Sequence, residues 1–158
     1  MRLSLVEIGL VGLAAVVVVT TIPRCSGDVS RATVLASWTL TPGVLNPAVD
    51  QATIRSSICV QGWTRTIRPP VAYTNGLKRK GLEQYGLRGP PSAYQEDHLI
   101  SLELGGHPTD PRNLWPEPYP RASQVDRIEN ELNAAVCSGR LSLAEAQQRE
   151  SSLKHRSG

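Results

Sequence analysis

The sequence predicts an α+β domain in which a short strand, a long loop, a short extended piece and a helix follow one another. Three observations support that prediction. The segment QEDHLISL is typical of a strand, residues 103–112 are rich in Gly, Pro and Asp, and an apolar stripe at helical spacing follows Ser123. The chain has 158 residues, of which 40% are hydrophobic, so it can form one modest domain with a core.

The first residues of the chain are typical of a targeting segment. Arg2 precedes an apolar run over residues 8–22, which has the length of a signal-peptide core and is short for a membrane span. A buried core helix would have a similar composition. We expect a signal peptide or an N-terminal membrane anchor at residues 1–24, a linker at 25–41, the functional domain at 42–150 and a polar tail at 151–158.

The three cysteines fit an exported protein. Cys25 lies against the apolar segment, so it is expected to be removed with that segment or to lie in the linker. Thiols far apart in an exported domain usually pair, and we therefore expect a disulfide between Cys59 and Cys137. The sequence has no Cys-x-x-Cys pair, which argues against a zinc site built from thiolates.

The segments before the strand are less regular. Residues after Asn46 fit either a short helix or a strand, and CVQGWTRTIRPP is expected to be extended until its two prolines end it. Thr74 is expected to cap a helix over residues 75–85, which Gly86 ends. The outer face of that helix carries LKRK, which fits either a solvated surface or a contact to backbone phosphates.

Two helices are expected after the strand and loop. In the first, Ser123 and Asp126 have the spacing of a capping box, and Gly139 ends the helix. The second helix begins at Ser142, which Glu145 caps. The apolar stripe of the first helix is predicted to consist of Val125, Ile128, Leu132 and Val136.

The segment EDHLISLELGGHPTDPRNLWPEP has the residue types that hydrolyse a phosphodiester. Asp97 offers an anionic oxygen and Asn113 an amide oxygen, which are ligands that Mg²⁺ or Mn²⁺ accepts. His98 has the side chain whose ordinary pKa allows it to take a proton from water near neutral pH. Neighbours on a regular strand point to opposite faces, so this hypothesis requires the strand to end or bend at Asp97.

The same segment resembles the core motif of the HNH superfamily of endonucleases, also called ββα-metal or His-Me finger nucleases. The likeness is greatest to small exported bacterial HNH-like proteins, and it extends over ICVQGW, RPPVAYT, NLWPEP and VCSG, from about residue 42 to 147. It implies a ββα-metal core with flanking helices and a loop-rich, disulfide-linked N-terminal part. It also implies that Asp97 and Asn113 bind the metal and that His98 is the general base.

The chain departs from that family in two places. Compact members have a further histidine on the helix after the asparagine, and PRASQVDRIEN contains none, so Asp126, Glu129 or water would complete the metal site. The C-terminal sequence QQRESSLKHRSG also lacks the apolar ending of the family.

The function that the resemblance implies is metal-dependent cleavage of nucleic acid outside the cytoplasm and largely without sequence specificity; the substrate is DNA or RNA, with DNA favoured. The formal net charge of +3 suits an anionic partner but is also common among exported proteins. The alternative is a non-catalytic exported or membrane-anchored binding protein on the same scaffold. Expected contacts to the nucleic-acid backbone are Arg65, Arg68, Lys78, Arg79 and Lys80.

Overall fold

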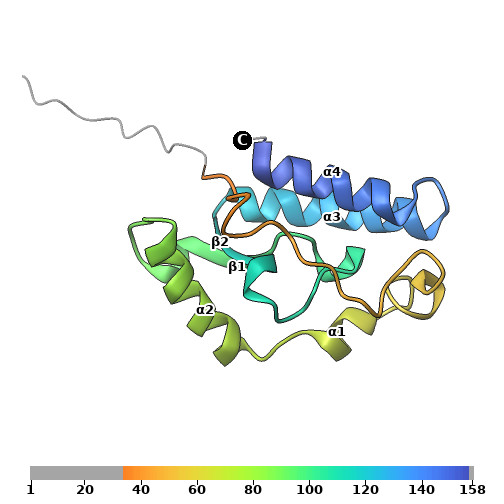
Figure 1. Cartoon of the computed structure of the whole chain (residues 1–158), viewed down its shortest axis with the longest axis horizontal. Helices are drawn as coiled ribbons and strands as arrows, with labels where there is room; N and C mark the ends of the chain where they lie inside the picture. The colour runs from red at the N-terminus through yellow and green to blue at the C-terminus, as the bar shows by residue number, and fades with distance from the viewer. Residues whose placement is uncertain (1–33, 157–158) are drawn as a thin grey trace, which may run out of the picture. The chain divides into compact units, whose positions relative to one another are not determined.

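The protein is described by a computed structural model over residues 34–156, which contain two strands and four α-helices joined by short 3₁₀ turns (Figure 1). The α+β prediction is confirmed. Strands β1 and β2 pair antiparallel, with Asp97 opposite Trp115. The bounds of the elements are Trp63–Ile67 for α1, Val71–Gln84 for α2, Tyr94–His98 for β1, Leu114–Pro118 for β2, Arg121–Cys137 for α3 and Leu143–Arg156 for α4.

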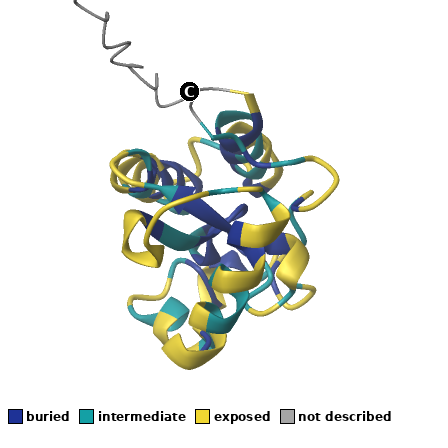
Figure 2. Cartoon of the chain, turned by 90° about the vertical axis from the view of Figure 1, so that its left-hand side faces the viewer, coloured by how far each residue is buried: buried dark blue, intermediate teal, exposed yellow. Residues whose placement is uncertain are grey.

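The small sheet lies between helices. Helices α2 and α3 both contact it, and in Figure 1 they lie on opposite sides, while α4 packs along α3. Both strands are short, and β2 is buried at four of its five positions, as the dark ribbon at the centre of Figure 2 shows. A strand of that kind is covered on both faces, so its side chains are fixed by the surrounding helices.

The main hydrophobic core lies away from the sheet. It joins the segment before α1, the loop after β1 and the facing sides of α3 and α4. A smaller cluster consists of Ala36, Leu99 and Trp115. The buried side chains of the main core are Val49, Ile54, Ile58, Ile100, Leu104, Leu132, Val136, Leu143 and Ala146.

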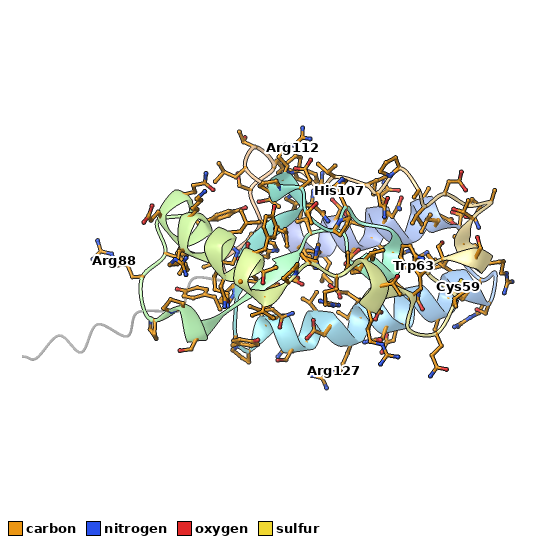
Figure 3. All side chains as sticks on the ribbon, turned by 90° about the horizontal axis from the view of Figure 1, so that it is seen from below. Cys59, Trp63, Arg88, His107, Arg112 and Arg127 are labelled. Atoms are coloured by element: carbon orange, nitrogen blue, oxygen red, sulfur yellow. A yellow bond between two sulfur atoms is a disulfide. The ribbon has the colours of Figure 1, made fainter. Side chains whose placement is uncertain are left out.

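The predicted disulfide is confirmed. Cys59 and Cys137 are bonded, with their Cα atoms 5.5 Å apart, and they tie the segment before α1 to the last residue of α3. Figure 3 shows Cys59 next to Trp63 at one end of the domain. The bond spans 78 residues of sequence, for which the chain-entropy model gives a stabilisation of about 4.5 kcal/mol.

The segment CVQGWTRTIRPP is not extended, as the sequence predicted, but contains α1. Gly62 turns the chain with a φ of 81°, and Trp63 packs against the main core. A left-handed residue breaks an extended run, and glycine adopts this conformation readily. Arg68 returns to an extended conformation before Pro69 and so ends the helix.

Helix α2 begins four residues earlier than predicted. Its first residue, Val71, follows Pro70, and the Thr74 hydroxyl donates to the carbonyl of Val71 instead of capping the helix. Gly86, at a φ of 63°, follows its C-terminus as predicted, and the N–H of Leu87 bonds back to the carbonyl of Leu82.

Helix α3 begins at Arg121, so the predicted capping box at Ser123 and Asp126 does not form. Its buried face also differs from the predicted stripe: Val125, Leu132 and Val136 are buried, but Ile128 is 37% exposed. Glu129 is buried in place of Ile128. An ionisable side chain therefore lies in the apolar face of this helix.

Helix α4 confirms the predicted cap. The carboxylate of Glu145 accepts hydrogen bonds from both the backbone N–H and the hydroxyl of Ser142. The helix continues to Arg156, so the polar tail expected from residue 151 onward is helical as far as the structure describes it, and it contains buried Lys154 and His155. The domain extends beyond the expected boundary because these side chains have partners inside the protein.

The described part of the expected linker, residues 34–41, packs onto the domain. The N–H of Ser37 and the hydroxyl of Thr41 bond to the phenol oxygen of Tyr85, and the ring of Trp38 stacks on His155 with 3.6 Å between centroids. These contacts make residues 34–41 part of the fold.

The predicted targeting segment and Cys25 lie outside the described residues. Within residues 34–156 no helix has the length and hydropathy to cross a membrane. The disulfide is compatible with an extracellular location, since such bonds persist in oxidising compartments.

Candidate metal centre

Asp97 and His98 end strand β1 and line the same small cavity, which has a volume of about 60 Å³. The sequence raised the objection that neighbours on a strand diverge. The strand does not end or bend at Asp97: both residues are still paired in β1, opposite Trp115 and Leu114, and the chain bends only after His98, so the two residues meet the cavity at the end of a regular strand. The other residues that line the cavity are Arg68, Gln95, Ser101, Leu102, Glu103, Asp126 and Glu129.

Three carboxylates converge at this cavity. One oxygen each from Asp97, Asp126 and Glu129 lies within 4.8 Å of the other two. Asp126 and Glu129 are three residues apart on α3, so they share the face of the helix that meets the end of β1. The sequence named both as candidates for the position of the missing helix histidine, and the structure brings both together with Asp97.

A hydrogen-bonded chain orients Asp126. The hydroxyl of Tyr119 donates to the amide oxygen of Gln95, and the amide nitrogen of Gln95 donates to Oδ1 of Asp126, each over 3.0 Å. Partners of this kind fix the rotamers of metal ligands and support affinity indirectly.

A buried lysine lies on the inner side of the carboxylates. The ammonium of Lys154, from the last turn of α4, is 2.7 Å from Oδ2 of Asp97 and 2.6 Å from Oε1 of Glu129. It also lies 3.3 Å from Glu150 and donates to the backbone carbonyl of His98 over 2.5 Å. The side chain is fully buried, so its charge is balanced by these partners and by the nearby Glu117 and not by solvent.

The pKa values of the buried acids shift in opposite directions. Burial would raise the pKa of Asp97, but the Lys154 ammonium and hydrogen bonds from Glu117 and Lys154 hold that pKa below its ordinary value. Burial raises the pKa of Glu129 well above its ordinary value, although Lys154 opposes the shift. Burial and the neighbouring charge of Asp97 raise the pKa of Glu117 to about 8. Of these three acids, only Asp97 has a pKa that is held below its ordinary value.

His98 is held in one orientation. Its Nε2 lies 3.0 Å from the carbonyl oxygen of Pro108. A carbonyl only accepts, so Nε2 carries the hydrogen, and Nδ1 of the neutral ring is left as an acceptor. Burial holds the pKa of His98 below its ordinary value, although the bond to Pro108 and the charge of Asp97 oppose that shift. The imidazole is consequently neutral at pH 7.

Asn113 has a different part in the structure from the one predicted. Its side chain is fully buried and braces the loop between the strands: Oδ1 accepts from the N–H of Ile100, and Nδ2 donates to the carbonyls of Ile100 and His107. It does not line the cavity beside Asp97. An amide whose hydrogens and oxygen are used in this way braces the loop, and the structure does not bring Asn113 to the cavity that Asp97 lines.

The Gly-Gly pair explains how the asparagine fits. A Cβ on Gly106 would lie 1.7 Å from the carbonyl oxygen of Ile100 and 2.8 Å from Nδ2 of Asn113. No residue other than glycine can occupy that position without moving the backbone. Gly106 and Asn113 therefore close the loop between the strands together.

The five predicted phosphate contacts are not gathered in one place. Arg68 is exposed and lines the cavity, which puts a cation beside His98 and Glu103. Lys78 donates to the carbonyl of Tyr94 instead, and Arg65 lies beside Gly62. Arg79 and Lys80 border a shallow hollow along α2. Of the five, only Arg68 is placed at the carboxylate site.

The residues at the cavity suit a hard divalent cation. They offer carboxylate oxygens, which Mg²⁺ and Mn²⁺ prefer. Ser101, another residue of the cavity wall, is only 4% exposed, and its hydroxyl has no hydrogen-bond partner in the protein. A buried hydroxyl of this kind requires a water or an ion-bound water to satisfy it. The volume of about 60 Å³ is enough for an ion and water.

Sequence reasoning missed Lys154, Glu150 and Glu117. The sequence contains one signal that could have indicated the burial of Glu150 and Lys154. The spacing of α4 puts both charged residues on the same helical face as two apolar ones: Leu143, Ala146, Glu150 and Lys154 follow one another at intervals of three, four and four.

The comparisons with known proteins add no relative. No family model, curated protein or solved structure matches the chain.

Proposed function

We propose that this domain is a metal-dependent nuclease of the HNH type that hydrolyses phosphodiester bonds in nucleic acid. The observation that carries the proposal is the convergence of Asp97, Asp126 and Glu129 beside an oriented, neutral His98. Perturbed ionisable groups gathered at one cavity are typical of catalytic sites. The arrangement of two short antiparallel strands followed by α3 supports the same assignment.

Each residue has a distinct part in the proposed reaction. Asp97, Asp126 and Glu129 hold one Mg²⁺ or Mn²⁺ ion, which supplies charge stabilisation to the phosphate and the leaving oxygen. His98 takes the proton of the attacking water at Nδ1, because its bond to Pro108 reserves Nε2 as the donor. Arg68, exposed at the cavity, binds a phosphate oxygen.

The substrate reaches the site from the exposed rim. Asp97, Glu129 and His98 are almost entirely buried, whereas Arg68 is exposed and Asp126 is half-buried. A phosphate that contacts Arg68 therefore approaches the ion from the side of Asp126. Contacts to the phosphate backbone carry no sequence information, so cleavage without sequence specificity is expected.

One observation favours a second candidate, a non-catalytic binding protein on this scaffold. Lys154 already places a positive charge against Asp97 and Glu129, so the carboxylates are partly compensated without a metal. In that case the acidic cluster serves stability, and the protein neither binds a divalent ion tightly nor cleaves nucleic acid.

A plasmid-nicking assay separates the two candidates. The oxidised full chain is incubated with supercoiled plasmid in Mg²⁺ or Mn²⁺, with a chelator control and with His98→Ala as a matched inactive variant. The proposal expects nicking that requires the ion and is lost in the variant. Absence of nicking with either ion, or equal nicking by His98→Ala, contradicts it.

A further inference from the structure

The Lys154 ammonium has the surroundings of a bound cation. Three of its contacts, to Asp97, Glu129 and the carbonyl of His98, are 2.5–2.7 Å long, and Glu150 lies at 3.3 Å. An ammonium has three hydrogens, and these three short contacts use all of them. Two of the partners are proposed metal ligands, and the third is the backbone of the proposed general base.

The rest of the protein holds this side chain in place. The carbonyl of Lys154 accepts from the N–H of Ala36, and the carbonyl of Leu153 accepts from the guanidinium of Arg121. The next residue, His155, bonds to the carbonyl of Thr41 through Nε2. Residues 34–41 and helix α3 thus both hold the last turn of α4 in place, so the ammonium is a fixed part of the site.

Glu150 completes the inner position. Both of its oxygens accept from the N–H of Ser101, at 2.9 and 3.0 Å, and the side chain is fully buried. It is one helical turn from Lys154 and does not line the cavity with Asp126. The cluster therefore has an outer side, made by Asp97, Asp126 and Glu129 at the cavity, and an inner side, made by Asp97, Glu129, Glu150 and the carbonyl of His98.

We propose that Lys154 is the built-in cation of the inner side, so that the domain takes one exchangeable divalent ion and not two. The inference rests on the proposed function for the outer ion. Three buried carboxylates stay ionised together only when a cation compensates them, and the ammonium provides one that cannot dissociate. The oxygens that face the ammonium are hard ligands of the kind that Mg²⁺ and Mn²⁺ prefer, so a divalent ion can take its place when Lys154 is removed. Lys154 is thereby a positioning residue, which holds two ligands in place for the outer ion.

The test counts bound ions. The full chain, Lys154→Ala and the double variant Lys154→Ala/Glu150→Gln are titrated with Mn²⁺, and bound ions are counted by equilibrium dialysis and calorimetry. The expected result is one ion for the wild-type protein, two for Lys154→Ala and one for the double variant, which loses the one inner carboxylate that the outer ion does not share. Lys80→Ala is the matched control, since Lys80 is exposed on α2, and one ion is expected.

The outcomes separate this inference from the proposed function. One ion for both the wild-type protein and Lys154→Ala overturns the inference and leaves the outer site standing. No ion for the wild-type protein and one for Lys154→Ala overturns the outer site but supports the inner position.

A second measurement needs no variant and covers the case in which Lys154→Ala does not fold. A crystal structure of the wild-type protein in Mn²⁺ is expected to hold one ion beside Asp126 while the ammonium stays against Asp97 and Glu129. An ion at the ammonium position, with the lysine displaced, overturns the inference.

Discussion

Two polar regions of the same small fold differ in how their polar atoms are used. In the loop around Asn113, every bond that the side chain makes goes to backbone of the loop, and Gly106 allows the close approach. Around Asp97, carboxylates from two elements converge on a cavity with an unpaired buried hydroxyl. The side chain of Asn113 finds all its hydrogen-bond partners in the protein, whereas the cavity at Asp97 has more carboxylate oxygens than the neighbouring cations can pair with.

The difference shows how one motif can contain both structural and reactive residues. Asp97, His98 and Asn113 lie close in sequence, but only the first two line the cavity. A polar side chain that saturates backbone groups stabilises the fold, and leaving such groups unpaired costs free energy. A carboxylate that faces other carboxylates is destabilising by itself and therefore indicates a cation. The four predictions that follow test this division, from the largest expected effect to the smallest.

The largest effect is expected when His98, the proposed general base, is replaced. His98→Ala should lower the rate of metal-dependent cleavage by about 10²–10⁴-fold, because positioned proton transfer is lost. Binding of Mn²⁺ should survive, since Asp97, Asp126 and Glu129 remain. Plasmid nicking and calorimetry on the same folded preparation measure both quantities. A variant that keeps its cleavage rate would show that His98 is not the base.

Asn113→Ala is expected to lower the free energy of unfolding by about 3 kcal/mol, because it leaves buried backbone groups of Ile100 and His107 without partners. Chemical denaturation followed by circular dichroism measures the change. Asn75→Ala is the matched control: Asn75 is exposed on α2, and its replacement should change stability by less than about 0.5 kcal/mol. Equal effects of the two substitutions would contradict the structural role of Asn113.

Arg68→Ala should raise the KM for nucleic acid about 10-fold and leave stability unchanged, since the exposed guanidinium is lost from the rim of the cavity. Arg65→Ala is the comparison, because Arg65 is also exposed but lies beside Gly62 and away from the cavity wall. Steady-state cleavage of an oligonucleotide duplex distinguishes the variants. If both raise KM alike, binding depends on general charge and not on the position of Arg68.

The smallest of the four effects is expected for the dependence of the cleavage rate on pH near neutrality. In the proposed reaction the neutral form of His98 is the base, and burial holds its pKa below 6.5 against the opposing charge of Asp97, while Arg68 and Lys154 reinforce the shift. Cleavage should therefore be nearly constant from pH 7 to pH 8 and fall as the pH drops through a midpoint below 6.5. A midpoint above 7 in the kcat/KM profile would contradict this assignment.

Much of the fold could be predicted because its signals are local. The strand around Asp97, the capping box at Ser142 and the disulfide all depend on short patterns or on the number of cysteines. Helix α1 could not be predicted, since its short sequence has no helical period and forms because Gly62 turns the chain and Trp63 packs on the core.

The site was only partly predictable for a related reason. Asp97 and His98 are residue types that suit a metal or a proton transfer and lie in the motif, and Asp126 and Glu129 were expected only as substitutes for the histidine missing from the helix. The role of Asn113 depends on which backbone groups it meets, and an amide oxygen can serve a metal or a loop equally well. Lys154 lies in a polar C-terminal stretch that is typical of solvent exposure, and only the apolar spacing of α4 indicates that it is buried.

The most direct test of the central claim is a calorimetric titration of Mn²⁺ into Asp97→Asn and Asn113→Ala, each compared with the wild-type protein under conditions in which all three are folded. The division between the two regions predicts that Asp97→Asn weakens Mn²⁺ binding at least 10-fold, because a charged ligand is lost. It predicts that Asn113→Ala binds Mn²⁺ with the affinity of the wild-type protein. Loss of Mn²⁺ binding in Asn113→Ala, with binding retained in Asp97→Asn, would contradict the assignment of the metal to the carboxylate cluster.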